Sequence, residues 1–244
     1  MQTPSALRYG ATAACGAVLC LLTGLAAADA RITADTQSGT TAYARMAQLE
    51  QYLMNSDAEI TLARSAAPAA ISAKATVLTL GPQGYRTAVN GSNGFTCLVE
   101  RGWMSPFDNP EFWSPKIRAP ICYNPAASKS ILEYTYARTR LVLSGRSREQ
   151  VLAEVRAKVA RKELQEPTPG AMSYMMSKDQ YLGDATVHWH SHLMFHVPKT
   201  EGASWGANMP GSPVVLDERP LPEPQTIFFV PVGRWSDGTL APAM

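Results

Sequence analysis

All four histidines of this chain fall within the stretch HWHSHLMFH, residues 188–196. Imidazole nitrogens bind transition metals and exchange protons near neutral pH, so this spacing is the first place to look for chemistry. Alternate residues of a β-strand point to the same face. The first face of such a strand would hold His188, His190, His192, Met194 and His196, and the second Trp189, Leu193, Phe195 and Val197. The pattern predicts a strand whose apolar face packs on the core and whose histidine face lines a cleft.

The strand spacing limits how these histidines can share an ion. Neighbours on one face lie about 6.6 Å apart, and two imidazoles at that distance can converge on one metal ion. His188 and His192 would lie about 13 Å apart, so a cage of four histidines needs a bulged strand. A feasible site is a neighbouring pair among His188, His190 and His192 with a third ligand from elsewhere. Candidates for that ligand are a displaced His196, a thiolate, or one of the carboxylates Asp184, Asp179, Asp108 and Glu100.

The ligand types leave more than one ion and more than one function open. Two imidazoles and a carboxylate suit Zn²⁺ with a bound water, which is the arrangement of a metal-dependent hydrolase. The thioether of Met194 would instead suit copper. The principal hypothesis is a binding protein, or a periplasmic maintenance protein, with a histidine-lined site that does or does not hold a transition metal. The alternatives are the hydrolase and a structural or partner-binding module without a metal.

A second motif has the form of a nucleophile elbow, GASWG at residues 202–206. The elbow places its serine between a strand and a helix, with a catalytic histidine later in the chain. Here Pro210 and Pro213 follow closely, and no histidine follows His196. Because proline interrupts a helix, we expect Ser204 to lie in a loop and not to act as a nucleophile.

The N-terminus has the pattern of a secretory signal peptide. Arg8 precedes an uncharged run at residues 11–28, which ends in small residues and the triplet Ala28-Asp29-Ala30. A basic start, an apolar centre and an A-x-A-like end predict a signal peptide over residues 1–30, cleaved after Ala28 or Ala30. The alternative is an uncleaved anchor. We expect a periplasmic or secreted protein without a membrane span once the signal is removed.

Two of the four cysteines, Cys97 and Cys122, lie beyond the predicted signal peptide. Paired cysteines are usual in an oxidising compartment, so a disulfide is expected, with a pair of thiolate metal ligands as the alternative. Charged residues make up 17% of the chain, the net charge is +2, and no basic block stands out. A nucleic-acid partner is therefore not expected, because neutralising phosphates requires clustered Lys and Arg.

Two helical signals lie between the predicted signal peptide and the first expected strands. Apolar residues recur at helical spacing over 41–54, and a second helix is expected over 58–65 with Asp57 as its N-cap. We assign residues 31–70 to an N-terminal helical segment. Three short runs at 76–81, 85–90 and 95–100 are separated by turn residues. They predict an antiparallel meander.

The remaining chain combines a rigid loop, one clear helix and further strands. Five prolines in 103–125 predict a long loop with no continuous helix or central strand, whose aromatic side chains either pin it to the core or contact a partner. The run 127–145 is ambiguous between helix and strand. Ser147 and Gln150 form a capping box before an amphipathic helix. Strands are expected within 171–183, at the histidine segment and within 225–233.

This order of elements favours an α+β fold over an α/β fold. We predict an antiparallel sheet, an N-terminal helical segment, and one long amphipathic helix packed on the sheet. Residues 71–244 would form one α+β domain that includes the proline-rich loop 103–125.

Four stretches carry a resemblance to a known group of sequences: NGFTCLVER, GAMSYMMSKDQYLGD, HWHSHLMF and WSDGT. Together they resemble a family of exported bacterial proteins to which no activity is assigned, over most of residues 42–240. The resemblance implies export and implies no particular reaction or ligand.

Overall fold

The computed structural model describes residues 43–184 and 186–242. The predicted signal peptide and the start of the expected helix at 41–54 lie outside these residues. Within the described ranges no helix has both the length and the apolar character needed to cross a membrane.

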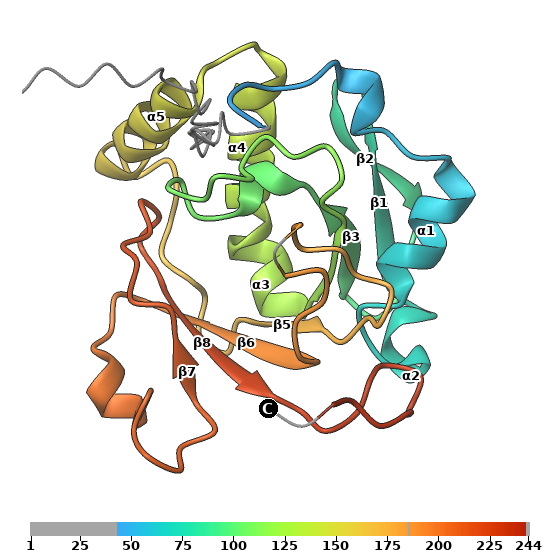
Figure 1. The fold of residues 1–244 in the computed structure, drawn as a ribbon, viewed down its shortest axis with the longest axis vertical. Helices are drawn as coiled ribbons and strands as arrows, with labels where there is room; N and C mark the ends of the chain where they lie inside the picture. The colour runs from blue at the N-terminus through green and yellow to red at the C-terminus, as the bar shows by residue number, and fades with distance from the viewer. Residues whose placement is uncertain (1–42, 185, 243–244) are drawn as a thin grey trace, which may run out of the picture. The chain divides into compact units, whose positions relative to one another are not determined.

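Eight strands form one sheet in the order β2-β1-β3-β4-β5-β6-β8-β7 (Figure 1). All neighbouring pairs are antiparallel except β1 and β3, which are parallel. The strands are β1 (Thr76–Gly81), β2 (Gly84–Val89), β3 (Thr96–Glu100), β4 (Ala119–Tyr123), β5 (Met172–Met175), β6 (His192–Val197), β7 (Val215–Leu216) and β8 (Thr226–Pro231). The predicted α+β class is confirmed.

Helices cover both faces of the sheet. They are α1 (Ser56–Arg64), α2 (Ala69–Ser72), α3 (Pro125–Ser130), α4 (Leu132–Leu143) and α5 (Arg148–Ala160), with short 3-10 turns η1 (Leu49–Gln51), η2 (Gly102–Met104) and η3 (Gly202–Trp205). Helix α1 packs on β1, β3 and β4, where Ala63 joins Cys97 and Val99 in one buried cluster. The alternate residues of β3 and β4, among them Leu98, face the larger core that includes α4. Helix α5 packs against α4.

The expected helix at 41–54 is wrong over its described part, which contains only the turn η1. Tyr52 is fully buried there, and its hydroxyl donates to the carbonyl of Trp113 at 2.6 Å. Its own carbonyl accepts from Arg101 at 2.8 Å, so tertiary hydrogen bonds replace a helical ladder. The following helix is capped two residues earlier than expected, because Asn55 rather than Asp57 accepts from the first helical N–H groups.

The predicted meander is also wrong, because β3 pairs with β1 and not with β2. Strand β2 is the half-exposed edge of the sheet, whereas Thr96 to Val99 of β3 are buried, so β3 requires an interior position. The connection crosses the start of β1 at Gly91. A Cβ on Gly91 would lie 2.1 Å from the backbone nitrogen of Thr76, so glycine permits this close crossing.

The proline-rich segment ends in a central strand, contrary to expectation, since β4 contains Pro120. Strand β5 pairs only with Cys122 and Tyr123, so Pro120 has one paired neighbour, as on an edge strand. Cys97 and Cys122 lie opposite one another in the β3–β4 register and form the expected disulfide. The aromatic side chains pin the loop to the core, as shown by the burial of Trp103, Phe112, Trp113 and Tyr123.

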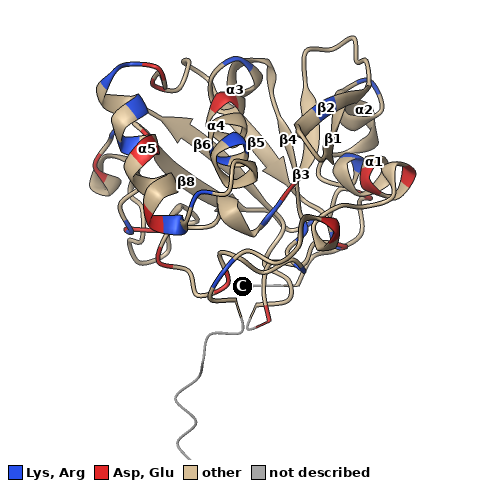
Figure 2. Ribbon diagram, turned by 90° about the horizontal axis from the view of Figure 1, so that it is seen from above, with Lys and Arg blue, Asp and Glu red and all other residues tan. Residues whose placement is uncertain are grey.

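The ambiguous run at 127–145 is helical, and the capping box predicted for the next helix is present. Ser147 accepts from the amide of Gln150, and the Gln150 side chain accepts from the amide of Ser147. Val151 and Val155 are the buried residues of this helix, α5. Figure 2 shows basic and acidic residues interspersed over the helices and loops in that view.

Candidate functional site: a cavity on the α4 face of the sheet

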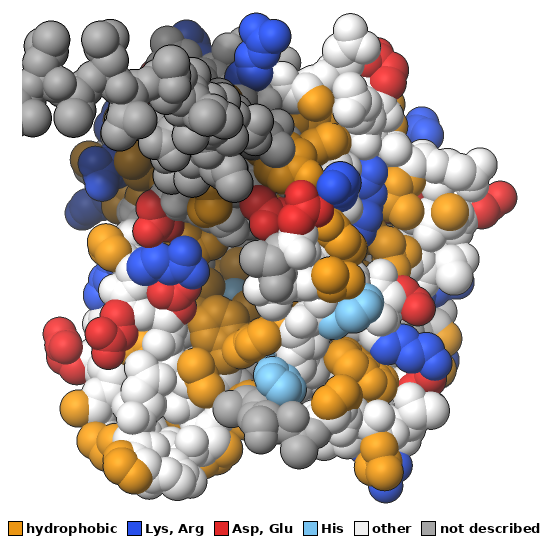
Figure 3. All heavy atoms as spheres, viewed as in Figure 1, with side chains coloured by type: hydrophobic (Ala, Val, Ile, Leu, Met, Phe, Trp, Pro, Cys, Tyr) orange, Lys and Arg blue, Asp and Glu red, His pale blue; other side chains and the backbone are white. Residues whose placement is uncertain are grey.

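A cavity of about 820 Å³ lies between the α4 face of the sheet and the segment that joins β6 to β8. Figure 3 shows a hollow with hydrophobic side chains inside it and acidic and basic side chains along its rim. The apolar lining includes Met104, Ile117, Ala119, Ile121, Ile131, Met175, Leu182, Met194, Met209, Leu216, Leu221, Ile227 and Phe229. The cavity is therefore a mainly apolar chamber of the size of small-molecule sites, which span roughly 300–1,000 Å³.

Strand periodicity explains why these side chains meet. Tyr123 lies opposite Thr96 in β3, Met194 lies opposite Ser173 in β5, and Phe229 lies opposite Met194. Directly paired residues share a face of the sheet, and so do residues two apart along each strand. Successive strands thus place alternate residues on the cavity wall, while the intervening residues face the opposite layer.

A buried ion pair joins α4 to the segment that leads into β8. Arg138 donates to both carboxylate oxygens of Glu223, at 2.7 and 2.9 Å. Its third nitrogen donates to the carbonyls of residues 103–105, at 2.9–3.3 Å. The Phe107 ring centroid lies 4.3 Å from the guanidinium carbon. Every guanidinium nitrogen of Arg138 therefore has a partner within the protein.

Arg101 also lines the cavity and is engaged to the same degree. Its Nη2 donates to Glu59 at 2.7 Å and its Nε donates to the carbonyl of Tyr52 at 2.8 Å. Its Nη1 donates to the carbonyl of Val99. Arg101 and Glu59 are both almost fully buried, so this pair is a structural unit beneath the cavity.

Glu100 is the carboxyl group on the sheet wall of the cavity, and it keeps a free oxygen. Its Oε1 accepts from the hydroxyl of Tyr123 at 2.6 Å and from Thr135 Oγ1 at 3.1 Å. Its Oε2 makes no hydrogen bond to any residue in 43–184 or 186–242. Burial raises the pKa of Glu100, and the hydrogen bonds from Tyr123 and Thr135 act against that shift.

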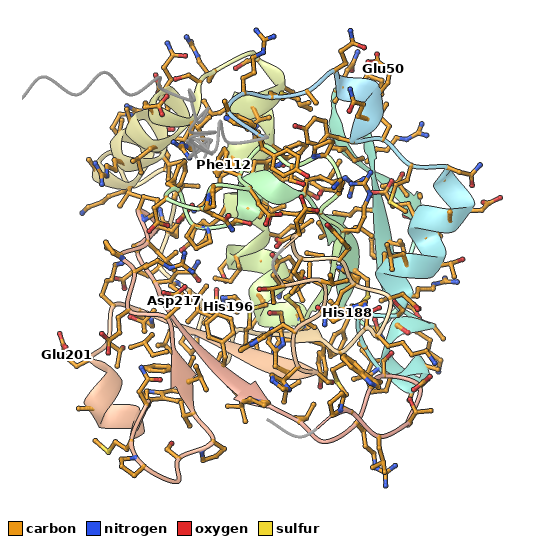
Figure 4. All side chains as sticks on the ribbon, viewed as in Figure 1. Glu50, Phe112, His188, His196, Glu201 and Asp217 are labelled. Atoms are coloured by element: carbon orange, nitrogen blue, oxygen red, sulfur yellow. A yellow bond between two sulfur atoms is a disulfide. The ribbon has the colours of Figure 1, made fainter. Side chains whose placement is uncertain are left out.

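His196 lies on the cavity wall as a neutral imidazole (Figure 4). Its Nδ1 lies 3.0 Å from Gln225 Oε1, which accepts only, so Nδ1 carries the proton. Its Nε2 then accepts from Ser173 Oγ at 2.9 Å. Burial lowers the pKa of His196 to about 4. Both ring nitrogens are engaged, so metal binding at this ring would require Ser173 or Gln225 to move away.

The predicted histidine strand begins only at His192. Residues 186–191 form a loop in which the carbonyl of Trp189 accepts from Gln180 Nε2 at 2.6 Å. His188 is exposed and His190 is half-buried. The strand prediction is therefore correct for 192–197 and wrong for 188–191. In the loop, the hydrogen bond from the Gln180 side chain to the carbonyl of Trp189 takes the place of backbone pairing with a neighbouring strand.

The expected orientation of the strand is reversed. His192, Met194 and His196 form its buried face, and Leu193, Phe195 and Val197 are only half-buried. The imidazoles are buried because polar partners satisfy them. His192 Nδ1 donates to the carbonyl of His190 at 2.6 Å, and burial lowers the pKa of His192 to about 4. Its ring lies 4.4 Å from that of Trp189, centroid to centroid.

The residues named as metal ligands are thus distributed over several places. His188 and His190 lie in a loop, His192 packs among aromatic rings, and His196 lines the cavity. Asp184 is exposed and accepts from Tyr43, Lys116 and Tyr181. Across residues 43–184 and 186–242, no three or more His, Cys, Asp or Glu side chains are grouped so that they could hold a metal ion.

Sequence reasoning named Glu100 only as one of several possible metal ligands, and it missed Arg138 and Glu223. The parity of β3 was an available signal, because Glu100 shares its face with Leu98 and Thr96 of the same strand. Glu223 lies in a proline-rich run without periodicity, and nothing in that run points to burial. Ser204 lies in η3, is exposed, and donates to the carbonyl of Glu201 at 2.8 Å.

Comparison of the chain with protein-family models, with curated proteins and with solved structures gives no match.

Proposed function

We propose that this chain is an exported binding protein that takes a small, largely apolar molecule into the cavity on the α4 face. The observation that carries the proposal is the cavity itself, with its volume of about 820 Å³ and its mainly apolar wall. Large apolar pockets with a few convergent polar groups are the usual form of small-molecule sites.

The chemistry of the wall supports a ligand that is bound mainly by contact. Four of the lining residues are methionines, Met104, Met175, Met194 and Met209. Methionine has an unbranched, polarizable side chain that adapts to ligands of different shape. The few polar groups, among them Glu100 and His196, would orient the ligand within this chamber.

Export is part of the proposal. The signal peptide predicted over residues 1–30 supports it, and so does the resemblance to exported bacterial proteins. The disulfide between Cys97 and Cys122 is consistent with an oxidising compartment. A periplasmic or secreted location would bring the cavity into contact with molecules outside the cytoplasm.

Zinc or copper binding and metal-dependent hydrolysis stay predictions. His196 already has hydrogen bonds at both ring nitrogens, and the Asp184 carboxylate is engaged by three donors. These contacts favour the apolar-ligand function over the metal functions.

The proposal is tested with a neutral fluorescent probe, N-phenylnaphthylamine, whose emission rises in apolar surroundings. We expect saturable binding to the mature protein. The Met194→Trp variant fills the cavity and should weaken binding at least about tenfold. Phe195→Trp is the matched control, because Phe195 adjoins Met194 but faces the other side of the sheet.

Circular dichroism and thermal unfolding verify that each variant is folded, and Ile227→Trp serves as a second blocking variant. Absence of saturable binding to the parent protein would overturn the proposal. Equal affinity of the parent and a folded blocking variant would overturn it as well.

A further inference from the structure

We propose that the cavity selects apolar molecules that carry a basic amine, with the Glu100 carboxylate as the partner of the ammonium group. This inference rests on the proposed function and adds the chemical class of the ligand. It follows from which charged groups at the cavity still have a free bonding position.

The two arginines of the wall offer nothing to a ligand. Arg138 donates from each of its guanidinium nitrogens to Glu223 and to backbone carbonyls. Arg101 does the same with Glu59 and two further carbonyls. A carboxylate or phosphate in the cavity would have to break one of these arrangements to obtain a guanidinium partner.

Glu100, unlike the two arginines, keeps a free bonding position. Tyr123 and Thr135 both donate to Oε1, which fixes the carboxyl group in place. Oε2 makes no hydrogen bond within the described part of the chain, and the half-buried Glu100 lines the cavity. A fixed carboxyl with one open oxygen in an apolar chamber is suited to a charge-assisted hydrogen bond from an ammonium group.

The charged residues at the rim of the cavity also favour a cation. Of the two basic residues there, Arg219 is paired with Asp217 at 2.9 Å, and Lys199 donates to the carbonyl of Leu221 at 3.0 Å. Glu201 and Glu218 line the same opening and form no salt bridge with a described residue. The charges that are left unpaired around the cavity are therefore mostly negative, which favours entry of a cation.

The electrostatics of Glu100 also favour a positive group in the cavity. Burial raises the pKa of Glu100 by disfavouring its charged form, and the hydrogen bonds from Tyr123 and Thr135 and the charge of Arg138 oppose that shift only in part. An ammonium group beside Oε2 would add a positive partner and favour the ionised carboxyl further.

The test compares three ligands that share one apolar skeleton: phenylbutylamine, phenylbutanol and phenylbutanoic acid. Each competes with the neutral probe for the parent protein at neutral pH. We expect the amine to bind at least about tenfold more tightly than the alcohol, and the acid to bind most weakly, because one charge-assisted hydrogen bond contributes this much. This comparison requires no variant.

Two variants then locate the preference. Glu100→Gln should reduce the advantage of the amine over the alcohol to about threefold or less, because the negative charge is gone. Probe binding by Glu100→Gln establishes that its cavity is intact. Glu133→Gln removes an exposed carboxylate of α4 that does not line the cavity, and it should keep the full preference.

The outcomes distinguish the inference from the function beneath it. If neither the probe nor any of the three ligands binds, the proposed function fails and the inference fails with it. If the probe binds but the alcohol or the acid equals the amine, the inference is overturned and the proposed function stands. A preference for the amine that survives in Glu100→Gln also overturns the inference.

Discussion

The buried pair of Arg138 and Glu223 allows the sharpest test of how this cavity is built. Glu223 is fully buried and belongs to the segment that borders the opening, whereas Arg138 belongs to α4. The substitution Glu223→Gln keeps the shape and removes the charge. An uncompensated guanidinium then remains in the interior, which costs about 3–5 kcal/mol of unfolding free energy. With a urea m-value of about 2 kcal/mol per molar, the midpoint should fall by about 2 M.

Urea unfolding followed by tryptophan fluorescence measures this effect, since the chain contains five tryptophans. Asp217→Asn is the matched control, because Asp217 lies in the same segment but pairs with Arg219 at the surface. The unfolding free energy of Asp217→Asn should fall by less than about 1 kcal/mol, as is usual when an exposed pair is broken. A loss below 1 kcal/mol for Glu223→Gln as well would refute the claim that this pair holds the cavity wall together.

The double substitution Arg138→Met with Glu223→Leu separates charge from hydrogen bonding. Replacing a buried pair by apolar side chains is often neutral. Here it would leave the carbonyls of residues 103–105 without their donor, at a cost of about 1–3 kcal/mol for each group left unsatisfied. We therefore expect the double variant to remain less stable than the parent protein. Full recovery of stability would show that these three carbonyl contacts contribute nothing.

Three further predictions concern the scaffold. Replacing Cys97 and Cys122 by alanine should lower the unfolding free energy by ~3.5 kcal/mol, from the loop entropy of a sequence separation of 25, and urea unfolding of the double variant measures it. Burial lowers the pKa of His196 to about 4 against 6.5 for the unfolded ring, so the unfolded chain binds this proton first and stability falls as pH drops from about 6.5 towards 4. In the His196→Gln variant, the fall in unfolding free energy between these two pH values should be smaller by on the order of 3 kcal/mol. Superimposable profiles of stability against pH for parent and variant would contradict the lowered pKa of His196. Gly91→Ala should destabilise the protein by at least about 2 kcal/mol because its Cβ would collide with the backbone of β1, whereas Gly233→Ala, where a Cβ meets nothing within 4 Å, should be close to neutral; equal melting temperatures would contradict this.

Local signals were sufficient to predict several elements of this fold. The capping box at Ser147 marked the start of α5, and two cysteines in a chain with a signal-peptide pattern predicted the disulfide. Strand parity also assigned His192 and His196 to one face of β6. These predictions succeeded because the determining interactions act over a few residues, or because the possible partners were very few.

Predictions failed where the outcome depends on partners far away in the chain. Strand parity predicts which residues share a face, but contacts with distant parts of the fold decide which face is buried. In β6 the histidine side is the buried one, and neutral imidazoles with polar partners fit there. Glu223 and Arg138 are separated by 85 positions, and no local pattern connects them. The same holds for the pairing of β3 with β1, which depends on the burial of β3 across the whole sheet.

The central claim is that a small apolar molecule enters the cavity, and methyl-labelled methionine tests it most directly. Met104, Met175, Met194 and Met209 line the cavity, whereas Met46, Met54, Met172 and Met176 do not. Addition of a saturating apolar ligand to the folded protein, followed by NMR of the methionine methyl groups, distinguishes the two sets. We predict shifts of the four cavity signals with little change in the other four. Unchanged cavity signals, or shifts confined to the methionines outside the cavity, would contradict the claim.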